Sequence, residues 1–253
     1  MADLNGKHAV VTGGGTGVGA VIAETLAHAG ARVTVMGRSE APLKQVAKQH
    51  KAIGYVTCDV TDPASVGAAF RDARGVNGAV DIIIANAGAA ESKPFKKTTA
   101  EEFQAMLDVN LTGVFNCFQA SLADMENAGE GRMISIASTA GLKGYPYVAG
   151  YVAAKHGVVG LTRALALELA KTGVTVNAIC PGFIETPMLE RSITNIMEKT
   201  GMDRDKAEKA LRAPNPQDRF VTPQEIADLV LWLCSDSARG VNGAALPVSG
   251  GEI

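Results

Sequence analysis

The sequence predicts an α/β fold, with a doubly wound parallel sheet and helices on both of its faces. Two observations predict it: strand-like and helix-like segments alternate from end to end, and the strand-like segments are short and apolar throughout. Strands of this kind are typical of a parallel sheet that is covered on both faces. The 253 residues contain no Pro/Ser-rich linker, charge block or internal repeat, so we expect one domain over residues 1–253.

Each expected strand is a short apolar run between two helical patterns. The expected strands are 7–12, 32–36, 55–58, 81–85, 132–137, 174–179 and 244–248. The expected helices are 18–29, 41–49, 64–74, 100–126, 150–171 and 223–234. Capping signals mark several helix starts: Asp62 precedes a proline, and Thr99 and Thr222 are each followed three residues later by Glu.

The alternation stops between Thr186 and Val221, where we expect no strand. Two short helices are expected there instead, over 188–200 and 203–211. They could be packing or interface elements.

Composition excludes several classes of partner. The chain has 24 basic and 26 acidic residues, so nothing suggests a nucleic acid or another polyanion. Residues 1–7 lack the basic and apolar runs of a signal peptide, and the apolar runs end well before the roughly 20 residues of a membrane span. The four cysteines are far apart, which predicts free buried thiols in a reducing cytoplasm, and no metal site is expected.

The pair Tyr151 and Lys155 carries the first chemical signal. Both lie in a proline-free run with helical spacing, and positions four apart face the same way on a helix. A free tyrosine has a pKa of about 10, and a nearby cation would lower it. The pattern is common, however, and also fits a surface lysine beside a half-buried tyrosine.

Two further segments give the pair a context. Ser138 ends an apolar strand, so its hydroxyl should point into the crevice where open α/β sheets bind ligands. The Gly-rich turn at 13–19 follows a strand and opens a helix, which would let backbone N–H groups approach a pyrophosphate.

These signals together resemble the short-chain dehydrogenase/reductase family over essentially the whole chain. The resemblance implies a Rossmann-type sheet, a small helical substrate lid at about 187–213, and an NAD(P)-dependent oxidoreductase acting on carbonyl or secondary alcohol groups. It assigns catalysis to Asn110, Ser138, Tyr151 and Lys155. It assigns the cofactor to Gly13, Thr16, Gly17, Val18, Gly19, Arg38, Asp59, Val60, Asn86, Ala87, Gly88, Tyr151, Lys155, Pro181, Gly182, Ile184 and Thr186.

The end of the second strand bears on the choice of cofactor. Gly37 stands where NAD-dependent members of the family usually have Asp, and Arg38 follows as in many NADP-dependent members. We therefore expect NADP(H) to be preferred and NAD(H) to be possible. Thr16 weakens this expectation, because many NADP enzymes have a basic residue there, and Glu40 is an alternative ribose partner. Asp59, expected to contact the adenine, could equally cap an ordinary turn.

The substrate is less clearly indicated. The expected crevice is lined by Ala140, Tyr145, Tyr147, Phe183 and Met188. The stretch 165–188 resembles 3-oxoacyl thioester (ACP/CoA) reductases and polyketide ketoreductases, which favours an acyl-thioester substrate. A secondary-alcohol or aromatic-ketone dehydrogenase is the alternative, and a catalytically silent nucleotide-binding regulator is an alternative of another class.

The assembly is also an expectation at this point. The helices over 100–126 and 150–171 are apolar over much of their surface, and in the family such helices pair between subunits. We expect a homotetramer, with a dimer as the second possibility.

Overall fold

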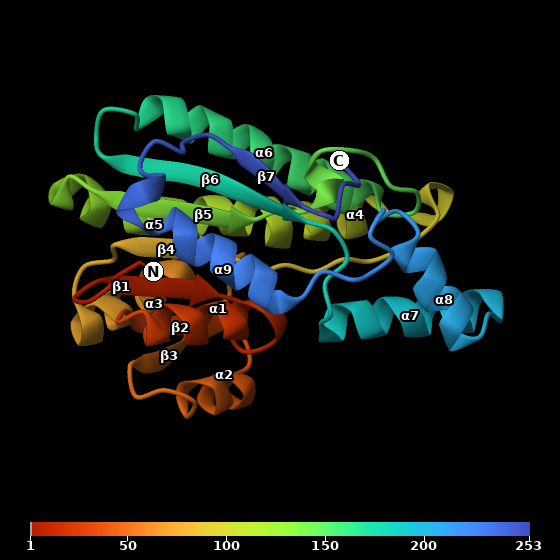
Figure 1. The fold of residues 1–253 in the computed structure, drawn as a ribbon, viewed down its shortest axis with the longest axis horizontal. Coiled ribbons are helices and arrows are strands. Elements are labelled where there is room, and N and C mark those ends of the chain that lie inside the picture. Colours follow the sequence, from red (N-terminus) through yellow and green to blue (C-terminus); the bar gives the residue numbers. More distant parts are fainter. Residues whose placement is uncertain (1) are drawn as a thin grey trace.

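The computed structural model describes residues 2–253 and shows one seven-stranded parallel sheet (Figure 1). The strand order is β3-β2-β1-β4-β5-β6-β7. The strands are β1 (His8–Thr12), β2 (Arg32–Gly37), β3 (Ile53–Thr57), β4 (Ile82–Ala85), β5 (Gly131–Ile136), β6 (Val174–Pro181) and β7 (Ala245–Val248). The parallel α/β fold expected from the sequence is confirmed, and every expected strand is present.

Helices connect the strands. They are α1 (Gly17–His28), α2 (Glu40–Ala47), α3 (Pro63–Asn77), α4 (Ala100–Leu107), α5 (Gly113–Ala128), α6 (Ala149–Glu168), α7 (Pro187–Thr200), α8 (Arg204–Arg212) and α9 (Pro223–Leu233). The expected caps are present: Asp62 accepts a hydrogen bond from the amide of Ala64, and Thr99 and Thr222 each form a capping box. Short 3₁₀ turns at Phe95–Lys97, Thr139–Gly141 and Asp236–Ala238 were not expected.

Alternate side chains of the strands fill two apolar layers. Val10, Ile83 and Met133 lie side by side across three strands and pack in the layer beneath α3, α5 and α6. Their neighbours Val11 and Ile84 point to the opposite face, into the layer beneath α1 and α9. Burying each such side chain contributes about 1.5–3 kcal/mol to the stability of the fold. Because both faces of the sheet carry these apolar side chains, both are covered by helices.

The expected continuous helix over 100–126 is wrong in one respect. A π-helical turn, Asp108–Thr112, separates α4 from α5. The side chain of Asn110 explains the interruption, because its Nδ2 donates to the carbonyl of Met106 at 3.0 Å, the carbonyl that the backbone amide of residue 110 would use in an α-helix. Such turns are frequent at functional sites.

The chain reverses its direction of winding between β1 and β4. Successive strands run outward from β1 to β3, and the chain then returns to place β4 on the other side of β1. Ligands of open α/β sheets bind at the carboxyl ends of the strands beside such a reversal. In Figure 1, α7 and α8 lie beyond this end of the sheet, on the side where the C-terminus also lies.

Residues 187–213 form the two expected helices and pack as a small separate cluster. Leu189, Ile193 and Ala207 are buried between α7 and α8, and the partly buried Phe183, from the segment before them, packs against this cluster. An isolated bridge between Ile184 and Val221 closes the base of this excursion. The helical unit expected over 187–213, called the lid below, is therefore present with its own apolar centre, and its role over a substrate stays a prediction.

Three further observations concern membrane-spanning helices, metal sites and cysteines. Within residues 2–253, no helix is both long and apolar enough to cross a membrane, and no cluster of His, Cys, Asp or Glu could hold a metal ion. The four cysteines are free and buried, as the sequence predicts.

Candidate active site

The glycine-rich turn after β1 is bound tightly to the segment after β4. The Thr12 hydroxyl accepts hydrogen bonds from the amides of Asn86 and Ala87, both at 3.1 Å. The Asn86 side chain donates in return to the Thr12 carbonyl at 2.9 Å. A side chain at Gly13 would lie 2.9 Å from the Cα of Ala87, so the close approach of the two segments requires a glycine there.

The same turn leaves a backbone cradle at the start of α1. Gly13 and Gly17 have positive φ angles of 63° and 55°, and a Cβ on Gly19 would collide with the Gly13 carbonyl. Within the described chain, the Thr16 side chain does not cap α1. Val18 and Gly19 belong to the first turn of the helix, whose N–H groups and dipole favour an anion. The cradle therefore fits the pyrophosphate of a dinucleotide.

The ends of β2 and β3 lie beside this cradle. Gly37 ends β2, and Arg38 follows it with an exposed side chain. Asp59 accepts hydrogen bonds from the amide and hydroxyl of Thr61 at 3.0 and 2.7 Å, which, with the charge of Arg38, lower its pKa. Asp59 thus caps a turn, as the simpler interpretation proposed, and its contact with an adenine stays a prediction.

Two expected residues near these strand ends have structural partners. Glu40 begins α2 and pairs with Lys44 at 2.9 Å, which favours its role as a helix start over that of a ribose partner. The carbonyl of Val60 accepts a hydrogen bond from the buried side chain of Asn116 at 2.9 Å.

Asn110 is fully buried and holds the segment after β4. Its Oδ1 accepts from the amide of Ala89 at 3.2 Å, and its Nδ2 donates to the Ala89 carbonyl at 2.8 Å. The buried amide of Asn110 therefore has specific hydrogen-bond partners for both of its polar atoms. A Cβ on Gly88 would lie 2.7 Å from Asn110 Oδ1 and 3.8 Å from the Nζ of Lys155, so Asn110, Gly88 and Lys155 meet at one point.

Ser138, Tyr151 and Lys155 come together at the carboxyl end of β5. Lys155 is buried, and its Nζ donates to the carbonyl of Ile136 at 2.9 Å. The same Nζ lies 5.6 Å from the centre of the Tyr151 ring. Ser138 lies two residues after the end of β5, accepts from the amide of Ala140 at 3.1 Å, and also interacts with the Tyr151 hydroxyl.

Burial dominates the electrostatics of this group. Burial raises the pKa of Tyr151 above its ordinary value, while the Ser138 hydroxyl partly opposes that rise. Burial also lowers the pKa of Lys155, to about 8. Desolvation dominates the pKa of Tyr151 in this geometry, and the ammonium of Lys155 is directed at the Ile136 carbonyl, so the expected lowering of the Tyr151 pKa by Lys155 stays a prediction.

The segment after β6 joins the cradle to the lid. The amide of Gly182 donates to Val248 at 3.0 Å, which holds this segment against β7. Thr186 caps α7 through the amide of Leu189, and its hydroxyl lies 3.2 Å from the carbonyl of Ile184. A Cβ on Gly17 would lie 3.4 Å from Thr186 Cγ2, so the glycine-rich turn touches the start of the lid.

The five residues expected to line the substrate crevice have different environments. Ala140 is buried, Phe183 packs on the lid helices, and Met188 is half-buried. Tyr147 is 62% exposed and has a positive φ of 69°, which is unusual for a residue with a side chain. The hydroxyl of Tyr145 is engaged within the protein, as described next.

A buried carboxylate that sequence reasoning missed lies beside these residues. The Tyr145 hydroxyl donates to Glu252 and lies 2.7 Å from Thr139 Oγ1. Lys143 pairs with the same carboxylate at 2.8 Å. Glu252 follows two glycines after the last strand, and nothing in its local pattern shows that the segment turns back toward the loop after β5.

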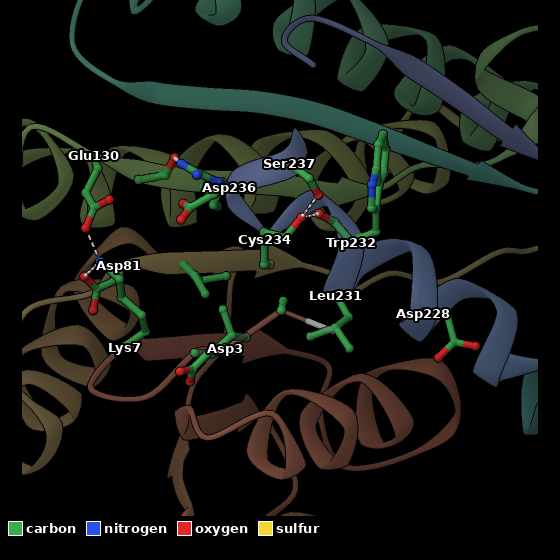
Figure 2. A pocket seen from close by; sticks show the side chains of 16 residues that line it. Asp3, Lys7, Asp81, Glu130, Asp228, Leu231, Trp232, Cys234, Asp236 and Ser237 are labelled. Atoms are coloured by element: carbon green, nitrogen blue, oxygen red, sulfur yellow. Dashed lines mark hydrogen bonds and ion pairs between the residues drawn. The ribbon is translucent and has the colours of Figure 1, made fainter. Parts of the chain in front are cut away.

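A large pocket lies at the opposite end of the strands from the candidate active site (Figure 2). It has a volume of about 870 Å³ and is lined by residues at the amino ends of the strands and by the end of α9. Figure 2 shows Lys7 between Asp81 and Glu130 on one wall and Trp232 on another. This pocket is not the candidate active site despite its volume, because the candidate catalytic side chains converge at the carboxyl ends of the strands.

The fold and the cradle together define a dinucleotide-binding protein, and its relatives are oxidoreductases. A family model described as Enoyl-(Acyl carrier protein) reductase matches residues 13–252. The D-beta-hydroxybutyrate dehydrogenase of Cupriavidus necator is 38% identical over 255 residues, which cover 99% of each chain. The granaticin polyketide synthase putative ketoacyl reductase 1 of Streptomyces violaceoruber is 40% identical, over 96% of this chain and 92% of that one.

A solved structure agrees with these relatives. A variant of actinorhodin polyketide ketoreductase with NADPH superposes with a TM-score of 0.94 at 36% identity, covering 100% of this chain and 99% of that one. The chain belongs to the short-chain dehydrogenase/reductase family. It is an oxidoreductase that acts on carbonyl or alcohol groups with a nicotinamide cofactor.

Replacing Gly88 by Ala tests the meeting point of Asn110 and Lys155. The added methyl group would push against Asn110 Oδ1, and a displacement of about 1 Å in such a site lowers turnover by about 100-fold. We expect kcat to fall by that order while the protein stays folded, as measured by steady-state rates and thermal melting. Gly160→Ala is the matched control, because a Cβ there meets no atom within 4 Å in the described structure. A folded Gly88→Ala enzyme with wild-type kcat would contradict the arrangement.

Proposed function

We propose that this protein interconverts a 3-oxoacyl thioester, in the first instance a CoA ester, and its 3-hydroxyacyl form. The observation that carries the proposal is the convergence of Asn110, Ser138, Tyr151 and Lys155 beside the glycine-rich cradle. A catalytically silent nucleotide-binding regulator would need the cradle alone. The hydroxyl pair and the buried ammonium point to chemistry at a carbonyl oxygen.

The side chains divide the work at that oxygen. During reduction Tyr151 gives a proton to the oxygen, since its raised pKa keeps the phenol protonated beforehand. During oxidation the phenolate form of Tyr151 takes the proton from the alcohol oxygen. Ser138 donates a hydrogen bond to the same oxygen. Lys155, with a pKa of about 8, is mostly charged at neutral pH and opposes the negative charge that forms on Tyr151. A bound nicotinamide cofactor supplies or accepts the hydride.

Asn110 has a supporting role in this scheme. It fixes the backbone of Ala89 and packs against Gly88, whose neighbour is the Lys155 ammonium. The buried amide thereby keeps the lysine and the segment after β4 in register.

The cofactor is held by three groups of residues in this proposal. The cradle and first turn of α1 bind the pyrophosphate, the ends of β2 to β4 bind the adenosine half, and the segment after β6 binds the carboxamide. Arg38 has an exposed side chain beside Gly37 and thus suits a 2′-phosphate, which favours NADP(H). NAD(H) is the second possibility, since Thr16 adds no positive charge.

The substrate class rests on the relatives and on the lid. Two of the three relatives described above bear ketoacyl or polyketide reductase names, and the helical lid over 187–213 is long enough to cover an acyl chain. A free 3-hydroxy acid is the second candidate, favoured by the name of the Cupriavidus necator relative. An aromatic ketone is a third, since the exposed ring of Tyr147 offers a stacking surface.

The proposal extends to location and assembly. Four free, buried thiols suit a reducing compartment, so we place the protein in the cytoplasm. Phe115 on α5 and Leu167 on α6 are 44% and 82% exposed, and these helices are the ones expected to pair between subunits. We propose a homotetramer with a dimer as the alternative.

Tyr151→Phe is the variant that tests the reaction. It removes the proton donor and leaves the cradle unchanged, so we expect turnover to fall by orders of magnitude while the cofactor dissociation constant stays nearly constant. Steady-state kinetics and cofactor titration measure the two quantities. Turnover like that of the wild type would sink the assignment of Tyr151.

A substrate panel tests the class of compound. We expect acetoacetyl-CoA and a longer 3-oxoacyl-CoA to be reduced with a higher kcat/KM than acetophenone, a simple cyclic ketone or acetoacetate. The assay follows NADPH and NADH oxidation. If an aryl or cyclic ketone or the free acid exceeds every thioester by more than about tenfold, which is about 1.4 kcal/mol of transition-state preference, the thioester assignment is wrong.

Arg38→Ala tests the cofactor preference. Loss of the guanidinium should raise the KM for NADPH and leave NADH use almost unchanged, because only NADPH carries the 2′-phosphate. Rates with both cofactors, at fixed substrate, decide the matter. Equal losses with the two cofactors would mean that Arg38 is structural.

Light scattering at micromolar concentration tests the assembly. We expect the mass of a tetramer, and we expect Leu167→Glu to dissociate it, because a charge would then be buried in the helix pairing. Val76→Glu is a matched control, since Val76 is 80% exposed on α3, outside the paired helices. A monomeric wild type would refute the proposal.

A further inference from the structure

The segment after β7 turns back and buries a carboxylate beside the candidate active site. Gly250 and Gly251 have positive φ angles of 63° and 96°, which allow the reversal, and they are followed by Glu252. The Glu252 side chain is only 2% exposed. A buried carboxylate is tolerated when it is paired and hydrogen-bonded, and Glu252 has both kinds of partner.

The two partners of Glu252 come from the loop after β5. The Lys143 ammonium lies 2.8 Å from Glu252 Oε1, and the Tyr145 hydroxyl donates to the same oxygen. Lys143 also lies 5.1 Å from the centre of the Tyr145 ring. Burial, reinforced by the bond to Glu252, raises the pKa of Tyr145, so the phenol stays protonated and keeps donating.

This cluster connects the loop after β5 with the segment after β6, between which the substrate is expected to bind. The Tyr145 hydroxyl lies 2.7 Å from Thr139 Oγ1, next to Ser138, in the loop after β5. On the other side, a Cβ on Gly182 would lie 3.4 Å from Glu252 Oε2, so the carboxylate also contacts the segment after β6. The net charge of Lys143, Tyr145 and Glu252 therefore affects the electrostatic potential beside the hydroxyls of Ser138 and Tyr151, which are proposed to bind the carbonyl oxygen.

Apart from the buried Lys155, the cation beside this cluster is Lys143. In the two loops, 138–149 and 181–189, Lys143 is the one basic residue of the sequence, and its side chain is 39% exposed. An unpaired ammonium in that position would attract a carboxylate substrate. The buried carboxylate of Glu252 neutralises the Lys143 ammonium and so cancels this attraction. Lys93, on the neighbouring segment, is cancelled in the same way by Glu102.

We propose that Glu252 is a specificity-determining residue: by neutralising Lys143 it suits the site to neutral 3-oxoacyl esters and thioesters and not to free 3-oxo acids. The proposal rests on the proposed function and deepens it. It explains how a chain 38% identical to a D-beta-hydroxybutyrate dehydrogenase would discriminate against the acid. The acid is disfavoured because the charge of Lys143 is already neutralised by Glu252 and does not attract the carboxylate of the acid.

The test compares a neutral substrate with an anionic one that shares its acyl group. S-acetoacetyl-N-acetylcysteamine and acetoacetate are assayed with the wild type and with Glu252→Gln, which keeps the shape of the side chain and removes its charge. We expect the kcat/KM ratio of acid to thioester to rise by about tenfold or more in the variant. A ratio within twofold of the wild type, in a variant that melts normally, overturns the proposal.

Two controls separate charge from packing. The double variant Lys143→Met with Glu252→Gln should return the ratio to the wild-type value, because the released cation is gone. Tyr145→Phe removes a hydrogen bond of the same carboxylate without changing the charge, so its ratio should stay at the wild-type value. A gain that persists in the double variant, or that appears in Tyr145→Phe, overturns the proposal.

A binding measurement keeps the inference independent of the proposed reaction. Butyrate is titrated into each protein with NADPH bound, and the fluorescence of the bound NADPH reports the dissociation constant. We expect Glu252→Gln to bind butyrate at least about tenfold more tightly than the wild type. If the wild type reduces neither acetoacetyl compound, the proposed function fails, while the butyrate constants still decide the role of Glu252.

Lys143→Gln is the second variant, should Glu252→Gln not fold. Loss of Lys143 leaves the Glu252 carboxylate without its cation, so Lys143→Gln should bind butyrate more weakly than the wild type and should have a lower acid-to-thioester ratio. Butyrate binding and a ratio that both stay within twofold of the wild type would show that the substrate does not feel these charges, and the proposal would be wrong.

Discussion

The rest of the site depends on the hydrogen bonds that join Thr12 to the segment after β4. One hydroxyl accepts from two successive amides, and the Asn86 side chain returns a bond to the Thr12 carbonyl. These bonds hold together two segments that are more than seventy residues apart in sequence. Because they are partly buried and neutral, they also avoid the desolvation penalty that an ion pair would carry in the same place.

From this junction the cradle and the catalytic group are built on opposite sides. The glycine turn extends one way to α1, while the segment after Asn86 extends the other way to Asn110 and Lys155. Burying the Lys155 ammonium is unfavourable, and the carbonyl of Ile136 compensates only in part, which is why its pKa is lowered to about 8. The protein thus holds the Lys155 cation in a buried position, where it would stabilise the negative charge that is proposed to form on Tyr151 during the reaction.

Much of the fold was predictable because it depends on local patterns. Strand positions follow from short apolar runs between helical periods, and Thr99 and Thr222 act as caps because their Glu partners lie three residues away. The pairing of Tyr151 and Lys155 follows from helical geometry in the same way. Local patterns decide such features without reference to the rest of the chain.

Features set by distant contacts were not predictable. The sign of the pKa shift of Tyr151 depends on how completely the fold buries it, which no spacing reveals. Glu252 reaches Tyr145 across more than a hundred residues of sequence. The π-helical turn exists because Asn110 finds Ala89 and Met106 at once, and only the packed structure brings those groups together.

That π-helical turn has a consequence for how the chain can vary in length. It places an extra residue between α4 and α5, and one residue corresponds to a rotation of about 100° around a helix axis. A single deletion within 108–110 would relieve the irregular turn and keep the faces of α4 and α5, because a π turn takes up about one residue more than an α turn. It would, however, rotate or remove the Asn110 side chain that binds Ala89 and Met106. Insertions and deletions of one residue should therefore be rare here in natural relatives, although the local helix would be more regular without the extra residue.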